Sequence, residues 1–232
     1  MRSMTIPSEE RLAGPLPEEP LATAAAWLAE AWRLHAQPNP NAMTLATCTG
    51  DGRPSARVVL CKEIVARPGY VVFYTNYRSR KGRELEGNGR AAAVLHFDVL
   101  GCQVRVEGVV ERSPATESDA YFASRALQSR IGAWASAQSE PIASREHLRA
   151  AVAAAAQRFG VDPGAVAADA AAEVRIPRPP HWGGYRLWAE AVELWVQGAA
   201  RIHDRARWTR RLTRREVGGM EGGEWSVTRL QP

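Results

Sequence analysis

Five short runs of β-prone residues decide the fold: AMTLATC (42–48), ARVVLCK (56–62), GYVVFYTN (69–76), AAAVLHF (91–97) and QVRVEGVVER (103–112). Turn-forming stretches such as TGDGRP, ARPG and GNGR separate them. Strands of this length at such regular spacing predict an antiparallel barrel or sandwich.

The segments on either side of these strands complete the fold class. A flexible, polar arm over residues 1–20 is expected to precede an amphipathic helix over 21–36, in which Leu21, Ala25, Leu28 and Trp32 recur at helical spacing. Later segments predict a helix opened by Ser113-Pro114 and running to about Ser124, a helix opened by Ser144, a long connection over 160–181, and strand-like runs over 183–197, 200–210 and 224–232. This order predicts one α+β domain over 21–232, built on a closed β-barrel. It excludes a doubly wound sheet, because helices do not alternate with the strands and no GxGxxG turn follows one.

Composition narrows the function class. The three cysteines form no CxxC pair or Cys/His cluster, so we expect neither a metal site nor a disulfide. The N-terminus lacks the apolar core of a signal peptide, and we find no apolar run of about 18 residues, so the expectation is a soluble cytoplasmic protein. A net charge of +5 keeps nucleic acid or a phosphorylated small molecule open as a partner.

The run ELWVQGAARIHDR (193–205) carries the strongest functional pattern. If it is a strand, its period of two places Arg201, His203 and Arg205 on one face. Close cations repel one another, so an anionic ligand would explain them. The arginines of 207–215 have a simpler interpretation as a solvated hairpin arm.

Two further cationic clusters lie between residues 57 and 81. Arg57 and Lys62 bound the run RVVLCK, whose alternative interpretation is an edge strand showing its charged ends to water. Arg78, Arg80 and Lys81 lie at a strand-to-helix junction with Ser79 as a candidate N-cap. Cations are disfavoured at a helix N-terminus, so their presence there favours a phosphate site.

A fourth cluster lies in YFASRALQSR. On one helix, Tyr121, Arg125 and Ser129 would share a face and offer donors to a phosphate. The alternative is an exposed helix whose Arg125 pairs with Glu117 or Asp119. The side chains of Gln103, Gln138 and Ser139 suit a polar heterocycle, and Trp195 offers a flat wall. Together these clusters hold more cations than one phosphate needs, which favours two phosphorylated ligands.

The motifs RVVLCK, FYTNYRSRKGREL, QVRVEG, YFASR, SRIGAWASAQS, PPHWGGYRL, VELWVQGAARIHDR and RLQP, in this order, resemble the pyridoxine (pyridoxamine) 5'-phosphate oxidase family of FMN-binding split barrels. The resemblance covers about residues 40–232 and implies a homodimer with each flavin at the subunit interface. It implies FMN contacts from Arg57, Val58, Val59, Leu60, Cys61, Lys62, Tyr74, Thr75, Arg80, Lys81, Gln103, Gln138, Ser139, Trp195 and Arg205. It assigns the substrate phosphate to Lys62, Tyr121, Arg125 and Ser129, and orientation of the pyridine ring to Arg201 and His203 as the catalytic pair.

The implied reaction oxidises pyridoxine 5'-phosphate or pyridoxamine 5'-phosphate with O2 to pyridoxal 5'-phosphate and H2O2. Hydride leaves the 4' carbon for FMN, and by hypothesis His203 takes the hydroxyl proton of the alcohol substrate. The chain departs from the family at Asn39, at Cys102 and in the long 160–181 connection, and its first residues lack a convincing lid.

Three other functions are open. One is a sister FMN oxidase acting on a phenazine precursor, which would not need the phosphate-binding residues. Another is a flavin-binding protein without catalysis. The third is a nucleic-acid-binding barrel, which we disfavour because no series of stacking aromatics accompanies the cations.

Overall fold

The computed structural model describes residues 11–162, 164, 166 and 174–232. Its strands are β1 (Ala42–Cys48), β2 (Pro54–Leu60), β3 (Glu63–Val65), β4 (Tyr70–Asn76), β5 (Arg90–Phe97), β6 (Cys102–Arg112), β7 (Trp182–Val196), β8 (Asp204–Thr209), β9 (Leu212–Arg214), β10 (Met220–Gly222) and β11 (Ser226–Leu230). Its helices are α1 (Pro20–Arg33), α2 (Arg80–Asn88), α3 (Ala115–Ala123), α4 (Leu127–Ala135) and α5 (Arg145–Arg158), with short 3-10 turns η2 (Asp98–Leu100) and η3 (Ala199–Arg201). All five strands expected between residues 42 and 112 are confirmed, and β3 is an addition.

The chain divides into two compact units. The barrel unit comprises Met1–Phe73, Asn88–Glu111 and Arg186–Pro232. The helical unit comprises Tyr74–Gly87 and Arg112–Tyr185.

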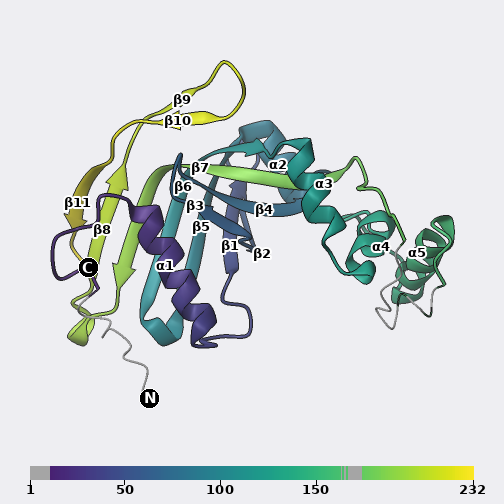
Figure 1. Ribbon diagram of the computed structural model, residues 1–232, viewed down its shortest axis with the longest axis horizontal. Helices are drawn as coiled ribbons and strands as arrows, with labels where there is room; N and C mark the ends of the chain where they lie inside the picture. Colours follow the sequence, from purple (N-terminus) through teal and green to yellow (C-terminus); the bar gives the residue numbers. More distant parts are fainter. Residues whose placement is uncertain (1–10, 163, 165, 167–173) are drawn as a thin grey trace. The chain divides into compact units, whose positions relative to one another are not determined.

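The sheet is a curled, antiparallel half-barrel (Figure 1). Its strand order is β11-β8-β7-β6-β5-β1-β2, and β4 pairs with β3 and β7. In the part of the chain that the structure describes, this path has two ends, β11 and β2, so the expected closed barrel is instead a split one. The α+β split-barrel class is confirmed.

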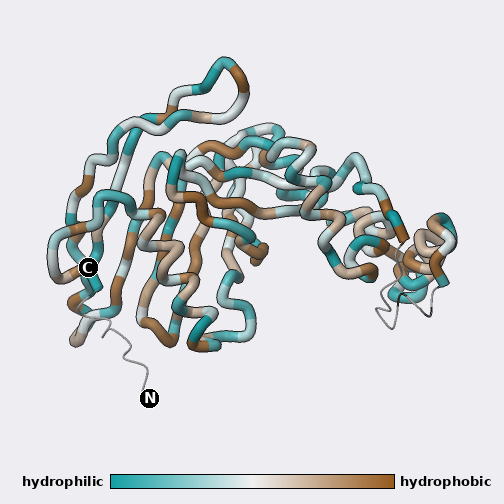
Figure 2. The backbone as a smooth tube through the Cα atoms, viewed as in Figure 1, coloured by the Kyte–Doolittle hydropathy of each residue, from teal (hydrophilic) through white to brown (hydrophobic). Residues whose placement is uncertain are grey.

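The core of the barrel unit follows from alternation along the strands. In β6, buried residues alternate with half-buried ones, as expected for a strand with one face on the core. Figure 2 shows hydrophobic residues along the central strands of the sheet, and Leu45, Leu95, Val104 and Leu194 are fully buried.

Helix α1 lies across one face of this sheet (Figure 1), and its buried face differs from the expected one. The buried positions are Leu21, Ala24, Trp27 and Ala31, whereas Trp32 is 48% exposed. Spacings of three and four residues place this set on one stripe. The expected stripe through Trp32 was therefore wrong by about one position.

Residues 11–19 of the expected arm are docked on the barrel unit. The indole Nε1 of Trp208 donates to the Pro17 carbonyl at 2.9 Å, and the Arg229 guanidinium donates to the carbonyls of Leu12 and Gly14. Arg11 forms an ion pair of 2.7 Å with Glu30 of α1. The first ten residues of that arm lie outside the described residues.

The helical unit packs α3, α4 and α5 around a small core that includes Phe122, Ile131 and Trp182. Ser144 caps α5 as expected, because its Oγ accepts from the backbone N–H groups of Glu146 and His147. The N-cap of α3 is Pro114, one residue later than Ser113, and has no side-chain cap. Much of the expected connection over 160–181 lies outside the described residues.

Among the helices in the described ranges, none is long and apolar enough to cross a membrane.

Candidate functional site

The junction between β4 and α2 has the expected cap. Ser79 Oγ accepts from the Gly82 backbone N–H at 3.3 Å and donates to the Asn76 carbonyl at 2.7 Å. A side chain at residue 82 would collide with the Tyr77 carbonyl, since an added Cβ would lie 2.0 Å from that oxygen. Gly82 therefore allows the tight entry into α2.

Several hydrogen-bond donors lie around Gln138, next to the junction between β4 and α2. Lys81 is only 8% exposed, and its Nζ donates to Ser79 Oγ and to Gln138 Oε1, both at 3.1 Å. Thr75 Oγ1 donates to the same Gln138 oxygen at 3.2 Å. The next residue, Ser139, has a left-handed backbone with φ of 74°.

A buried ammonium, a hydroxyl and an oriented amide form a donor set that suits a phosphate or a polar heterocycle. These residues therefore fit the FMN that the sequence implies. Arg80 lies at the start of α2, where its Nε donates to Glu84 at 2.9 Å.

The segment from Tyr121 to Ser129 is not one helix, as its spacing had suggested. Helix α3 ends at Ala123 and α4 begins at Leu127, so Arg125 lies in the break. The Ser124 Oγ donates to the Tyr121 carbonyl at 2.9 Å and helps to end α3. Ser129 is exposed on α4.

Arg125 faces an aromatic stack. The rings of Tyr74, Tyr121 and Trp182 are stacked, with 4.0 Å between the centroids of the first two. The Arg125 guanidinium lies 4.5 Å from the centroid of Trp182. Tyr74 and Tyr121, expected to bind cofactor and substrate respectively, are thus in contact.

The guanidinium of Arg125 lacks a partner for one buried donor. Its Nη1 is buried and makes no hydrogen bond to any described residue. Burial lowers the pKa of Arg125, and the nearby Tyr121 partly opposes this shift. The alternative of an ion pair with Glu117 or Asp119 is wrong among the described residues, and Asp119 pairs instead with Arg178 at 2.6 Å. An anionic ligand would satisfy Arg125.

The segment from Arg201 to Arg205 is not a continuous strand. Strand β7 ends at Val196 and β8 begins at Asp204, with η3 between them. Ala200 and Arg201 have left-handed φ values of 52° and 64°. The expected alternation of three residues on one strand face is therefore wrong.

His203 lies beside Trp195 after this turn. The two ring centroids are 4.6 Å apart. The Gly198 backbone N–H donates to His203 Nδ1 at 3.2 Å, so the neutral ring carries its proton on Nε2 and offers a donor there. Arg201 is exposed and makes no hydrogen bond or ion pair with another described residue.

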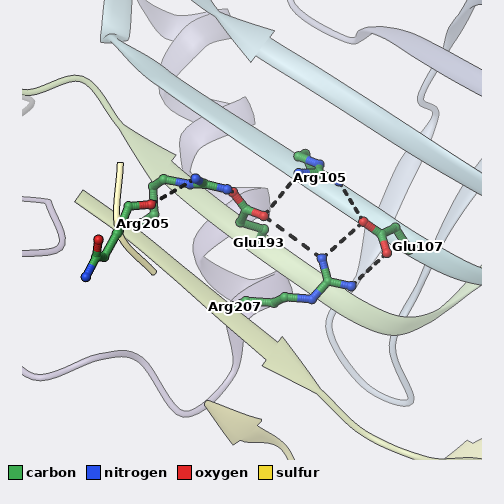
Figure 3. Close-up of polar contacts among 6 residues, drawn as sticks. Arg105, Glu107, Glu193, Arg205 and Arg207 are labelled. Atoms are coloured by element: carbon green, nitrogen blue, oxygen red, sulfur yellow. Dashed lines mark hydrogen bonds and ion pairs between the residues drawn. The ribbon is translucent and has the colours of Figure 1, made fainter. Parts of the chain in front are cut away.

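Arg205 lies on β8, directly opposite Trp195 of β7. It forms an ion pair with Glu193 at 2.8 Å, within a network that also contains Arg105, Glu107 and Arg207 (Figure 3). Gln103 is half-buried on β6, opposite His96 of β5.

The run RVVLCK is the edge strand β2 and its continuation, as the alternative interpretation held. Its apolar residues are not buried as a group, since Val58 is 65% exposed, Leu60 is 39% exposed and Val59 is half-buried. The Arg57 guanidinium donates to the Leu45 carbonyl and to the hydroxyls of Thr47 and Ser55.

The two residues after β2 differ in environment. Cys61 is buried, which raises the pKa of its thiol to about 12, and Lys62 is exposed. The three cysteines are free thiols.

Sequence reasoning missed two residues of these clusters. Trp182 supports the aromatic stack, and Glu193 binds Arg205. A single carboxylate inside the apolar run VELWV was the available signal for Glu193, because buried charges are rare unless paired.

Comparison with known proteins identifies the class. The chain matches the pyridoxamine 5'-phosphate oxidase family over residues 32–159 and the pyridoxine 5'-phosphate oxidase C-terminal dimerisation region over residues 182–232. It is 47% identical to a pyridoxine/pyridoxamine 5'-phosphate oxidase of Cereibacter sphaeroides, over 93% of this chain and 96% of that protein. It is 46% identical to the protein of that name from Burkholderia lata, over 92% of this chain and 89% of the relative.

Among solved structures, PhzG from Burkholderia lata 383, in complex with tetrahydrophenazine-1-carboxylic acid, is similar with a TM-score of 0.75 and 33% identity. The likeness covers 93% of this chain and 94% of PhzG. Fold and relatives together define an oxidoreductase of the split-barrel class. More specifically, this chain belongs to the pyridoxine/pyridoxamine 5'-phosphate oxidase family.

Proposed function

We propose that this chain oxidises pyridoxine 5'-phosphate and pyridoxamine 5'-phosphate to pyridoxal 5'-phosphate, with FMN as cofactor and O2 as acceptor, releasing H2O2. The curated relatives at 46–47% identity that carry this activity in their names support the proposal. Bound FMN would supply hydride acceptance from the 4' carbon and electron transfer to O2. The match to a dimerisation region supports a homodimer as the working unit.

For the cofactor we propose the full set that the family resemblance implies. The donors around Lys81 and Gln138 suit the FMN phosphate and polar edges, because an ammonium and a hydroxyl already converge there. The remaining members of the set are Arg57, Val58, Val59, Leu60, Cys61, Lys62, Tyr74, Arg80, Gln103, Ser139, Trp195 and Arg205.

The environment of Arg125 is the main structural support for a phosphorylated substrate. A buried guanidinium donor without a protein partner is costly, and a phosphate oxygen would satisfy it. Tyr121, beside it, adds a hydroxyl donor, and Lys62 and Ser129 complete the proposed phosphate set.

Arg201 and His203 would orient the pyridine ring. Arg201 offers an exposed guanidinium. His203 offers its Nε2–H as a donor, because its Nδ1 already accepts from the Gly198 N–H. That bond argues against the hypothesis that His203 takes the hydroxyl proton, because a neutral ring with Nδ1 as acceptor has no free basic nitrogen.

A second candidate is a phenazine-precursor oxidase, favoured by the similarity to PhzG. The chain is more similar to the Burkholderia lata oxidase, at 46% identity, than to PhzG from the same organism, at 33%. A tricyclic carboxylic acid also offers no phosphate for the whole set of Lys62, Tyr121, Arg125 and Ser129, although its carboxylate would satisfy Arg125 alone. A flavin-binding protein without catalysis is the third candidate.

An anaerobic titration of the FMN-loaded protein tests the proposal. Pyridoxine 5'-phosphate should bleach the blue absorption band of the flavin, and air should restore it. Tetrahydrophenazine-1-carboxylic acid, titrated in parallel, should leave the band unchanged. Bleaching by the phenazine precursor alone would support the second candidate, and bleaching by neither would support the third. A protein that takes up no FMN would contradict the proposal.

A further inference from the structure

Glu193 is the most deeply buried carboxylate of the network around Arg205. It lies on β7 and is only 3% exposed. Its Oε1 accepts from Arg205 Nε at 3.0 Å and from Arg205 Nη2 at 2.8 Å (Figure 3). Its Oε2 accepts from Arg105 Nη1 at 3.2 Å and lies 4.0 Å from Arg207 Nη1. A carboxylate at this depth requires such partners, because burying an unpaired charge is strongly unfavourable.

Glu107, the second carboxylate of the network, binds the other two arginines and not Arg205. Glu107 accepts from Arg207 at 2.7 Å and from Arg105 at 2.8 Å, and makes no contact with Arg205. Three guanidiniums thus share two carboxylates, and one positive charge is in excess. The network can therefore accept an anionic ligand without forcing two carboxylates or two anions together.

The strand register shows that the ion-pair partner of Arg205 is not the residue directly opposite it. Its partner opposite on β7 is Trp195, while Glu193 is opposite Arg207. Arg205 reaches diagonally along β7 to bind Glu193, a distance that a long side chain spans in an antiparallel pair.

The hydrogen bonds fix which edge of the Arg205 guanidinium is presented. Glu193 takes one N–H from Nε and one from Nη2, and the Gln231 carbonyl takes one from Nη1 at 2.9 Å. A guanidinium has five N–H groups, so two remain without a partner among the described residues. One of these is on Nη1 and the other on Nη2.

We propose that Glu193 is a positioning residue for the cofactor: it does not contact FMN, but holds Arg205 so that the N–H groups left without a protein partner meet the ligand. This inference rests on the proposed function, in which Arg205 and Trp195 contact FMN. Trp195 lies two residues along β7 from Glu193, on the same strand face, so one strand supplies both the aromatic contact and the anchor of the cation.

Glu107 provides a matched control. Changing either Glu193 or Glu107 to Gln removes one carboxylate from the same network and preserves side-chain size. Only Glu193→Gln releases Arg205. A purely structural role for the network predicts that any loss of FMN affinity follows the loss of stability in both variants, whereas positioning of Arg205 predicts that only Glu193→Gln weakens FMN binding beyond its effect on stability.

The test measures the FMN dissociation constant of the full-length apoprotein by quenching of flavin fluorescence. We expect Glu193→Gln to weaken FMN binding about 10- to 50-fold and Glu107→Gln by less than about 3-fold, because only the first loses the charge-assisted bonds to Arg205. Glu193→Asp, which keeps the charge one methylene short, should fall between Glu193→Gln and wild type. It also serves as the test if the Gln variant does not fold.

Coupling to Arg205 completes the test. Adding Glu193→Gln to Arg205→Met should weaken FMN binding no further than Arg205→Met does alone. Equal effects of the two Gln variants, additive effects of Glu193→Gln and Arg205→Met, or wild-type affinity in Glu193→Asp would each overturn the inference while leaving the proposed function intact. A wild-type apoprotein that does not bind FMN would overturn both.

Discussion

Replacing Arg125 with Met separates a ligand-binding guanidinium from a structural one. The Nη1 of Arg125 is buried and has no hydrogen-bond partner among the described residues. If it binds the substrate phosphate, its loss removes a charge-assisted hydrogen bond of about 1.5–3 kcal/mol. We expect kcat/KM for pyridoxine 5'-phosphate to fall by about 10- to 150-fold.

The same change should have little effect on folding. Arg125→Met removes a desolvated cation whose pKa is lowered by burial, which favours the variant. It also removes the stacking on Trp182, a contact of about 0.5–1 kcal/mol, which disfavours it. The two effects oppose each other, so the free energy of unfolding should stay within about 1 kcal/mol of wild type.

Arg178→Met is the matched control in the same helical unit. Arg178 pairs with Asp119 and donates to the Trp182 carbonyl, each at 2.6 Å. This variant should lose about 1–3 kcal/mol of stability with a smaller effect on kcat/KM.

Urea unfolding of the apoproteins and steady-state oxidation of phosphorylated and unphosphorylated pyridoxine measure these effects. The reasoning is refuted if Arg125→Met destabilises the protein as Arg178→Met does, or if its kcat/KM falls equally for the two substrates.

Three shorter predictions concern the barrel unit. His203→Gln keeps a hydrogen-bond donor, so kcat/KM should stay within about tenfold of wild type and its pH profile should not change. The reason is that the Gly198 N–H occupies Nδ1 of His203, so that only the Nε2 donor is available to the substrate. A flattened pH profile would instead support His203 as the base. The pKa of Glu107 is lowered chiefly by the hydrogen bond from Arg207. The carboxylate therefore stabilises the protein at pH values above its unfolded-state pKa, and this stabilisation is lost as pH falls through the folded-state pKa. The stability difference between wild type and Glu107→Gln in urea unfolding should therefore be largest near neutral pH and vanish in acid; a constant difference would contradict this. Trp208→Phe removes the donor to Pro17 and leaves a cavity at a fully buried position, so it should lower stability by more than about 1 kcal/mol. It should also speed proteolysis of residues 11–19, and unchanged cleavage would show that this bond does not hold the segment.

The strands were predictable because their signal is local. Alternation and turn residues placed β1 at its observed bounds of Ala42–Cys48, and β6 within one residue of those expected. Helix capping at Ser79 and Ser144 was predictable for the same reason, since one hydroxyl and its own next turn make the contact.

The errors occurred where tertiary contacts override local preference. The Ala-rich segment around Arg125 contains no Gly or Pro to announce the break between α3 and α4. Likewise, Ala200 and Arg201 adopt left-handed φ values that their residue types rarely take, so the period-two interpretation failed there. Both departures from local preference involve residues proposed to bind the substrate, as is expected where function constrains the backbone.

The sequence shows how many cations the candidate clusters contain, but the structure of each unit shows which of them have carboxylate partners. Arg207 pairs with Glu107, and Arg205 pairs with Glu193. Arg125 is half-buried beside aromatic rings, with its Nη1 fully buried, and has no such acid among the described residues. An arginine with a carboxylate partner can bind a ligand only through the N–H groups that the partner does not use. An arginine with a buried, unpartnered N–H group needs an anionic ligand to satisfy it. The two kinds should therefore respond differently to mutation. Loss of Arg205 removes two hydrogen bonds from the buried Glu193 carboxylate and should lower stability, whereas loss of Arg125 should lower mainly the affinity for a phosphorylated ligand.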